Sequence, residues 1–221
     1  MSPRAYRMEA RLAAAEETRA RIVAAAREML GAPGGIGAFT VDAVAGAAGV
    51  ARMTVYNRFG SKTGLIEAVF DSLAIVRTGV PRLVAALALT DPAETLAEFV
   101  RTFAGVWQED RLVVRRLQGL AALDPEFAQV WHAREARRRG GMREIATRVA
   151  AARPVPPALD IEAVTAALYA ILSPEAFDAM AGETRTYEEV APLVLQLARR
   201  ALGLEAGSEP VSLATPARGV T

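Results

Sequence analysis

The chain has 221 residues, 52% of them hydrophobic, with 26 basic and 25 acidic side chains. It contains no cysteine and a single histidine, His132, which excludes disulfides, cysteine nucleophiles, thiolate zinc sites and multi-histidine metal sites. No segment offers about 18 consecutive uncharged apolar residues, and the N-terminus lacks the apolar core of a signal peptide. We therefore expect a cytoplasmic protein with no membrane span.

The charge is distributed unevenly along the chain. Residues 1–62 carry nine basic and five acidic side chains, a net charge of +4, whereas residues 63–221 have a net charge of −3. Lys62, the single lysine, closes the basic region. A basic N-terminal quarter on a mildly acidic body indicates that this end meets a polyanion.

Helical periodicity and capping signals predict several helices in the first third of the chain. Residues 1 to about 15 are expected to form a loose arm or a frayed helix. The helices that follow are predicted at Thr18–Leu30, Val41–Ala48, Ala51–Phe59 and Lys62 to about Val76. Thr40 and Ser61 are the predicted N-caps, and Gly49 and Gly60 end the two short helices.

The remaining breaks are also typical of helix ends. DPAE at 91–94 starts a helix to about Gln108, DPEF at 124–127 starts a long segment toward Arg153, and RPVPP breaks the chain. Asp160 caps the next helix, SPEAF at 173–177 kinks or restarts it, and TYEE at 186–189 is a capping box. Gly140 and Gly141 mark a bend, a close helix crossing or a true break. Residues from about 205 are expected to be disordered.

These elements predict an all-α fold of about nine or ten helices, since no alternating strand pattern of useful length appears. We predict a three-helix unit with an N-terminal arm at 1–62, a larger helical bundle at 63–204, and a tail at 205–221. No cofactor and no catalytic residue is expected.

Two short helices joined by a tight glycine turn are typical of a helix-turn-helix, whose second helix enters the DNA major groove. The predicted helix 51–59 has an apolar side, formed by Val50, Val55 and Phe59, and a polar remainder. Arginine recognises guanine, asparagine recognises adenine, and threonine or methionine can contact the thymine methyl. The predicted DNA-binding residues are Thr40, Val41, Arg52, Met53, Thr54, Tyr56, Asn57, Arg58 and Lys62.

FTVDAVAGAAGVARMTVYNRFGSKTGLIEAVF, from Phe39 onward, resembles the DNA-binding domain of TetR-type regulators, which are repressors similar to the tetracycline repressor. The resemblance covers about residues 18–70. The matching positions are Thr40, Ala45, Ala48, Gly49, Val50, Thr54, Val55, Tyr56, Phe59, Ser61, Lys62 and Leu65. Arg52, Met53 and Asn57 depart from the family pattern at positions that affect the choice of operator.

The resemblance implies a homodimer that binds a pseudo-palindromic double-stranded DNA operator and is released by a small, mostly apolar effector. It also implies that residues 1–62 form the helix-turn-helix DNA-binding domain and that the bundle at 63–204 serves ligand binding and dimerisation. Dimerisation would use the helices around 160–180 and 186–203. The alternatives are a transcriptional activator of the same fold, or an all-α small-molecule-binding protein or enzyme with a vestigial helix-turn-helix.

The effector pocket is predicted from aromatic and apolar periodicity in the bundle. Its predicted lining is Phe99, Phe103, Trp107, Leu117, Trp131 and Tyr169. REARRR at 134–139 is interpreted as a solvated helix face, although an acidic ligand is the alternative. His132 is expected to be a packing or surface residue.

Overall fold

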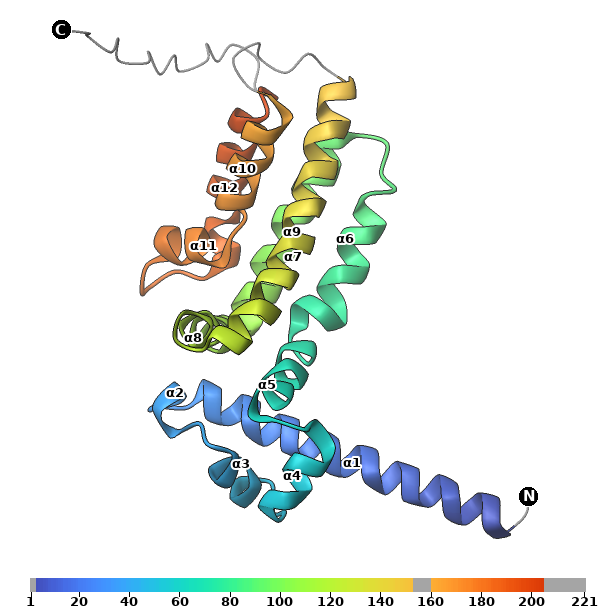
Figure 1. Cartoon of the computed structure of the whole chain (residues 1–221). Coiled ribbons are helices and arrows are strands. Elements are labelled where there is room, and N and C mark those ends of the chain that lie inside the picture. Colours follow the sequence, from blue (N-terminus) through green and yellow to red (C-terminus); the bar gives the residue numbers. More distant parts are fainter. Residues whose placement is uncertain (1–2, 153–159, 205–221) are drawn as a thin grey trace, which may run out of the picture.

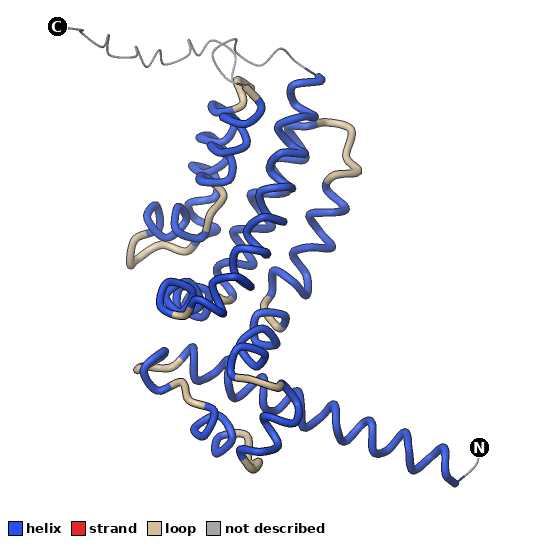
Figure 2. Tube along the Cα trace, viewed as in Figure 1, coloured by secondary structure: helices blue, strands red, loops and turns tan. Residues whose placement is uncertain are grey.

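The computed structural model describes residues 3–152 and 160–204, and these residues form helices and connecting loops without any strand (Figures 1 and 2). The predicted all-α fold is therefore confirmed. The elements are α1 (Pro3–Gly31), α2 (Gly35–Ala38), α3 (Val41–Ala47), α4 (Arg52–Phe59), α5 (Lys62–Asp71), the π-helical segment η1 (Ile75–Gly79), α6 (Val80–Ala86), α7 (Pro92–Glu109), α8 (Arg111–Leu123), α9 (Pro125–Ala152), α10 (Ile161–Ile171), α11 (Pro174–Ala181) and α12 (Tyr187–Ala201).

In the N-terminal unit, α3 and α5 pack against α1, and α4 packs against α3 and α5. Its core contains Ile22 of α1, Val44 of α3, Val55 of α4 and Leu65 of α5, all nearly inaccessible to solvent. α1 begins at Pro3, so the predicted start at Thr18 was too late, and of the two alternatives for residues 1 to about 15 the helix is the one found. The absence of Gly or Pro between residues 4 and 30 allows the helix to continue outward, and it projects from the unit in Figure 1.

The predicted caps in this unit are confirmed. The Thr40 hydroxyl accepts a hydrogen bond from the Ala43 N–H at 3.1 Å, and the Ser61 hydroxyl accepts one from the Gly64 N–H at 2.9 Å. Gly49 and Gly60 have φ values of 66° and 73°, which favour glycine and end α3 and α4.

The helix expected from Lys62 to Val76 is interrupted. The α-helical part ends at Asp71, and the chain continues through Ser72–Ala74 into the π-helical segment η1 and then α6. Leu73 and Ala74 are fully buried at this break. The Ala74 N–H donates to the Asp110 carboxylate at 2.6 Å, so a buried acceptor outside the helix replaces an intrahelical partner.

The C-terminal bundle is built around α7 and α9. α12 packs on α7 and α10 packs on α9, while α6 covers the opposite side of this pair (Figure 1). Asp91, Asp160 and Ser173 cap their helices through side-chain oxygens, and Thr186 and Glu189 form the predicted capping box. The predicted restart at SPEAF is confirmed by α11.

α9 continues through Gly140 and Gly141 without a break. A Cβ added at Gly141 would lie 3.9 Å from the Phe99 ring, an ordinary van der Waals distance, and one at Gly140 would meet no atom within 4 Å, so neither glycine is required by a close helix crossing. The predicted break at RPVPP, residues 153–157, and the predicted tail from residue 205 both lie outside the described residues.

Candidate functional site

The helix-turn-helix presents one side of α4 to solvent. Val55 is buried against the N-terminal core, and Thr54, Tyr56 and Phe59 are half-buried. Arg52, Met53, Asn57 and Arg58 are exposed, as a helix that is to enter a DNA groove requires. Most of the predicted reading residues thus lie together on one helix face or at its margin.

Arg52 has one partner on α3 and one on α4 at the protein surface. Its Nη1 lies 2.7 Å from Asp42 Oδ2 on α3, and its Nη2 donates to the Tyr56 hydroxyl at 3.3 Å. The Tyr56 hydroxyl and then Asp42 raise the pKa of the Arg52 guanidinium above its ordinary value. Arg52 therefore stays charged and spans the two helices of the motif.

The N-termini of α3 and α5 flank α4, the helix predicted to enter the DNA major groove. Thr40 caps α3 and is exposed, and Lys62 begins α5 and is exposed, with its Nζ 5.7 Å from the centre of the Phe39 ring. Helix N-termini favour anions because their first N–H groups lack intrahelical acceptors. Val41 is buried, so its backbone N–H is the only part of it suited to such a contact.

A cavity of about 450 Å³ lies in the bundle between η1, α6, α7 and α9. Its body is apolar, and its lining includes Phe70, Ile75, Val76, Val80, Leu83, Val84, Leu87, Phe99, Phe103, Trp107, Gly141 and Met142. Its polar residues are Asp71, Arg134, Glu135, Arg137 and Arg138. An apolar cavity of this size with a few polar groups is typical of a small-molecule site.

Three of the predicted pocket residues, Phe99, Phe103 and Trp107, line this cavity on successive turns of α7. The other three lie outside its lining. Leu117 is buried in α8, and Trp131 packs edge-on against Phe70 with ring centroids 5.7 Å apart. Tyr169 does not line the cavity itself, but its hydroxyl donates a hydrogen bond at 2.5 Å to Glu135, which does.

The solvated face predicted for REARRR at 134–139 is wrong for three of its six residues. Arg134, Glu135 and Arg138 are partly buried and line the cavity, whereas Ala136, Arg137 and Arg139 are exposed. Arg138 pairs with Glu135 at 2.7 Å and donates to the Tyr169 carbonyl at 2.9 Å. Arg134 and Glu135 precede Arg138 by four and three positions, which places them near it on one side of the helix, and this spacing was the available signal.

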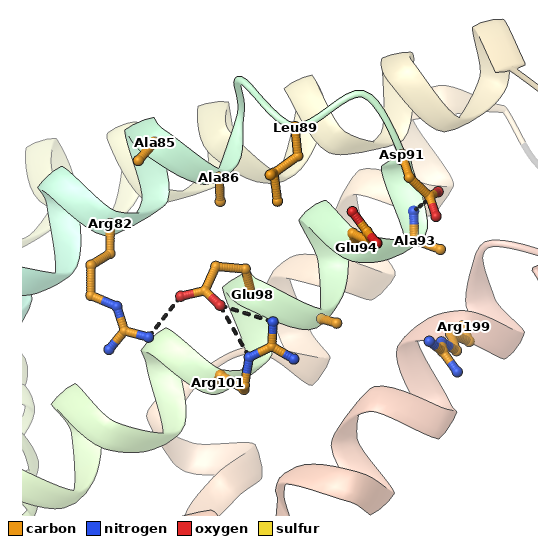
Figure 3. A pocket seen from close by; sticks show the side chains of 11 residues that line it. Arg82, Ala85, Ala86, Leu89, Asp91, Ala93, Glu94, Glu98, Arg101 and Arg199 are labelled. Carbon is orange, nitrogen blue, oxygen red and sulfur yellow. Dashed lines mark hydrogen bonds and ion pairs between the residues drawn. The ribbon is translucent and has the colours of Figure 1, made fainter.

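A second, more polar hollow of about 620 Å³ lies between α6, the following loop and α7, near Arg199 of α12 (Figure 3). Its centre is occupied by Glu98, which pairs with Arg82 at 2.7 Å and with Arg101 at 2.9 Å. The hydrogen bond from Arg82 is the main cause that lowers the pKa of Glu98. This ion-pair network ties α6 to α7 along the side of the bundle.

Asp110 connects the bundle to the N-terminal unit. Its carboxylate accepts hydrogen bonds from Arg27 of α1 and from the Ala74 N–H just before η1. Burial raises the pKa of this carboxyl, while the Ala74 N–H and Arg27 oppose the rise. One buried side chain thus joins α1, the helix break and the start of α8.

The described helices include none that is both long and apolar enough to cross a membrane. Residues 22–69 match the family described as bacterial regulatory proteins, tetR family. No curated protein matches the chain.

Several solved structures share the fold over most of their length. The TetR family transcriptional regulator PfmR from Thermus thermophilus is 26% identical, with a TM-score of 0.62 over 81% of this chain and 97% of that one. NalD, the secondary repressor of the MexAB-OprM multidrug efflux pump in Pseudomonas aeruginosa, is 20% identical, with a TM-score of 0.64 over 85% and 96%. A TetR transcription regulator from Haloarcula marismortui is 17% identical, with a TM-score of 0.66 over 86% and 98%.

Three observations point to the same kind of protein. They are the exposed α4 between two helix N-termini, the family match of residues 22–69 and the helical fold shared with TetR family regulators. The resemblance read from the sequence is therefore confirmed: residues 22–69 match the tetR family of bacterial regulatory proteins, and the helical fold is shared with TetR family transcriptional regulators.

Proposed function

We propose that this protein is a ligand-responsive repressor that binds a pseudo-palindromic operator as a homodimer and leaves it when a small, mostly apolar effector enters the bundle. The observation that carries the proposal is the exposed polar face of α4, held on the same chain as an apolar cavity. α5 connects the two sites, because it packs against α4 and its last two residues, Phe70 and Asp71, line the cavity.

On DNA, α4 is proposed to lie in the major groove. Arg52, Met53, Thr54 and Asn57 would contact base edges, whereas Tyr56, Arg58, Lys62 and the N-termini at Thr40 and Val41 would contact phosphates. A dimer must place its two reading helices about one helical turn, about 34 Å, apart. A change in the tilt of α5 alters that separation and therefore the affinity for the operator.

The dimer is proposed to form through α10 and α12. Ile161, Leu193 and Leu197 are exposed large apolar side chains on these helices, and Leu193 and Leu197 follow at i, i+4 on one face of α12. α10 and α12 lie on the side of the α7–α9 pair away from α6 (Figure 1). Burying these residues against a second copy removes apolar surface from water on both partners.

The effector is proposed to occupy the cavity between η1, α6, α7 and α9. A ligand there contacts Phe70, Asp71 and Ile75, so it acts directly on the end of α5 and on η1. If the effector binds better to the conformation that cannot span the operator, operator DNA must weaken effector binding by the same factor.

The deciding experiment is titration of the purified protein against its own upstream intergenic duplex, with a scrambled duplex as control, at two salt concentrations. Selective binding with a steep salt dependence is expected, because phosphate contacts release counterions. Equal, weak binding to both duplexes, together with equal binding to the duplexes of neighbouring genes, would contradict the proposal.

A further inference from the structure

The polar end of the apolar cavity has an excess of positive charge. Three arginines, Arg134, Arg137 and Arg138, line it together with two acids, Asp71 and Glu135. Glu135 is already engaged by Arg138 and by the Tyr169 hydroxyl. A cationic ligand would therefore find one acid in use and three arginines nearby.

Two buried donors on the cavity lining have no acceptor among the described residues. They are the indole N–H of Trp107 and the Nε–H of Arg134. The Trp107 residue is only 5% exposed, so solvent scarcely reaches it. Buried donors without acceptors cost free energy, and a bound molecule whose acceptor oxygens reach these N–H groups removes this cost. A purely hydrocarbon ligand would leave both donors unpaired.

Arg134 is the cavity arginine whose ion-pair partner, Asp71, a ligand anion could replace. Its Nη2 lies 2.8 Å from Asp71 Oδ1, and its guanidinium carbon is 4.2 Å from the Phe70 ring centre. The Arg134 side chain is only 15% exposed, whereas the Asp71 side chain is 55% exposed. Arg134 is thus fixed in the cavity wall, while Asp71 can turn into water without losing solvation. Arg138, by contrast, is held by Glu135 and the Tyr169 carbonyl.

We propose that the effector is an amphipathic organic carboxylate whose head group replaces Asp71 at Arg134, with its apolar body lying among Phe99, Phe103 and Trp107. This inference rests on the proposed function, because it names the chemistry of the same effector site. A carboxylate supplies acceptor oxygens to a buried guanidinium in a charge-assisted contact, which a neutral head group cannot match.

The exchange also explains how the cavity acts on the reading helix. Asp71 is the last residue of α5, and its pair with Arg134 fastens that end of α5 to α9. α5 begins at Lys62 and packs on both α1 and α4 (Figure 1). When the ligand carboxylate takes Arg134, α5 loses this ion pair with α9, which favours a change in the tilt of α5.

The test measures ligand binding to the full-length protein without DNA, by isothermal titration calorimetry. The probes are straight-chain carboxylates from hexanoate to hexadecanoate, and for the best of them the alcohol and the trimethylammonium compound of equal chain length. The carboxylate is expected to bind about ten-fold or more tightly than the alcohol, and the cation not at all.

Two variants with opposite expected effects identify the contact. Arg134→Gln should weaken carboxylate binding about ten-fold or more and leave alcohol binding unchanged. Asp71→Asn removes the competing carboxylate and should strengthen carboxylate binding. Arg143→Gln is the matched control, since Arg143 is an exposed arginine of α9 that pairs with Glu162 at 2.6 Å, outside the cavity lining.

The inference is overturned if no carboxylate binds, if the alcohol binds as tightly, or if both variants bind the carboxylate as the wild type does. Operator release is measured separately with the same compounds. Release by the alcohol alone would overturn the carboxylate inference and leave the proposed function standing. Tight carboxylate binding without any change in operator affinity would support the ligand class and contradict effector release.

Discussion

At the scale of single residues, Arg52, which we propose to contact a base, already has two partners on the protein. A free arginine loses rotamer entropy when it docks on a base, but Asp42 and Tyr56 already restrict this one. Its position on the exposed side of α4 and its charge were readable from the sequence. The pairing with Asp42 was not, because it joins residues ten positions apart on two helices whose relative orientation depends on the fold.

Arg52→Ala is expected to weaken operator binding by about 1–3 kcal/mol and to reduce the preference for operator over scrambled duplex, provided that the side chain contacts a base. Lys62→Ala should instead weaken both duplexes alike and reduce the salt slope by about one. Fluorescence anisotropy titrations at two salt concentrations measure both effects, with Arg143→Ala as the control. If Arg52→Ala keeps the wild-type preference, Arg52 does not read the sequence.

At the scale of elements, the turn between α4 and α5 depends on how closely two backbones approach. Gly64, in the first turn of α5, lies so close to the end of α4 that an added Cβ would be 2.1 Å from the Phe59 carbonyl oxygen. This contact explains a glycine inside a helix, where it otherwise lowers helix stability. The sequence shows the glycine, but only the fold shows the carbonyl that it must avoid.

Gly64→Ala is expected to destabilise the protein by about 1–3 kcal/mol, because a backbone carbonyl cannot move aside as a flexible side chain can. Gly46→Ala is the matched control, since Gly46 lies in α3 with no atom within 4 Å of the added Cβ. That substitution should stabilise the helix by up to about 1 kcal/mol. Urea unfolding followed by circular dichroism measures both, and equal stability of the two variants would rule out the steric account.

Asp178 of α11 joins three helices. It accepts a hydrogen bond from Arg111 of α8 at 2.8 Å, and also hydrogen bonds from Arg115 of α8 and the Tyr187 hydroxyl of α12. Burial acts to raise the pKa of Asp178, but the hydrogen bonds from Arg115, Tyr187 and Arg111 outweigh it, and the pKa is lowered overall. Its stabilising contribution is therefore present above the unfolded-state pKa, about 3.9, and is lost as the pH falls through the lower folded-state pKa.

Asp178→Asn should lower the free energy of unfolding at pH 7 by about 1–3 kcal/mol, and the difference from the wild type should shrink below about pH 4. Urea denaturation across the acid range measures this difference. Glu144→Gln, which alters an exposed carboxyl of α9, is the control and should behave as the wild type at every pH. A difference that stays constant with pH would show that the charge of Asp178 contributes nothing.

At the scale of the whole molecule, the proposed dimer brings two copies of α10 and α12 together. Leu193→Glu combined with Leu197→Glu should convert the dimer to a monomer, because charged side chains would have to be buried without partners. Light scattering measures the mass. Leu123→Glu is the matched control, because Leu123 is the most exposed of the large apolar residues described, and it lies on α8. An unchanged mass in the double variant would place the interface elsewhere.

Local signals alone determined the all-α class, most helix starts and the helix-turn-helix, since caps, glycine turns and apolar periodicity act within a few residues. The tertiary structure decided where α5 ends, because Asp110 offers its buried acceptor from far along the chain. It also decided the polar lining of the cavity: the spacing of Arg134 and Arg138 places them on one helix face, but only the fold shows that this face is covered while Arg137 and Arg139 stay exposed. Which face of a charged helix is buried depends on the neighbour that covers it, and that neighbour is set only when the chain has folded.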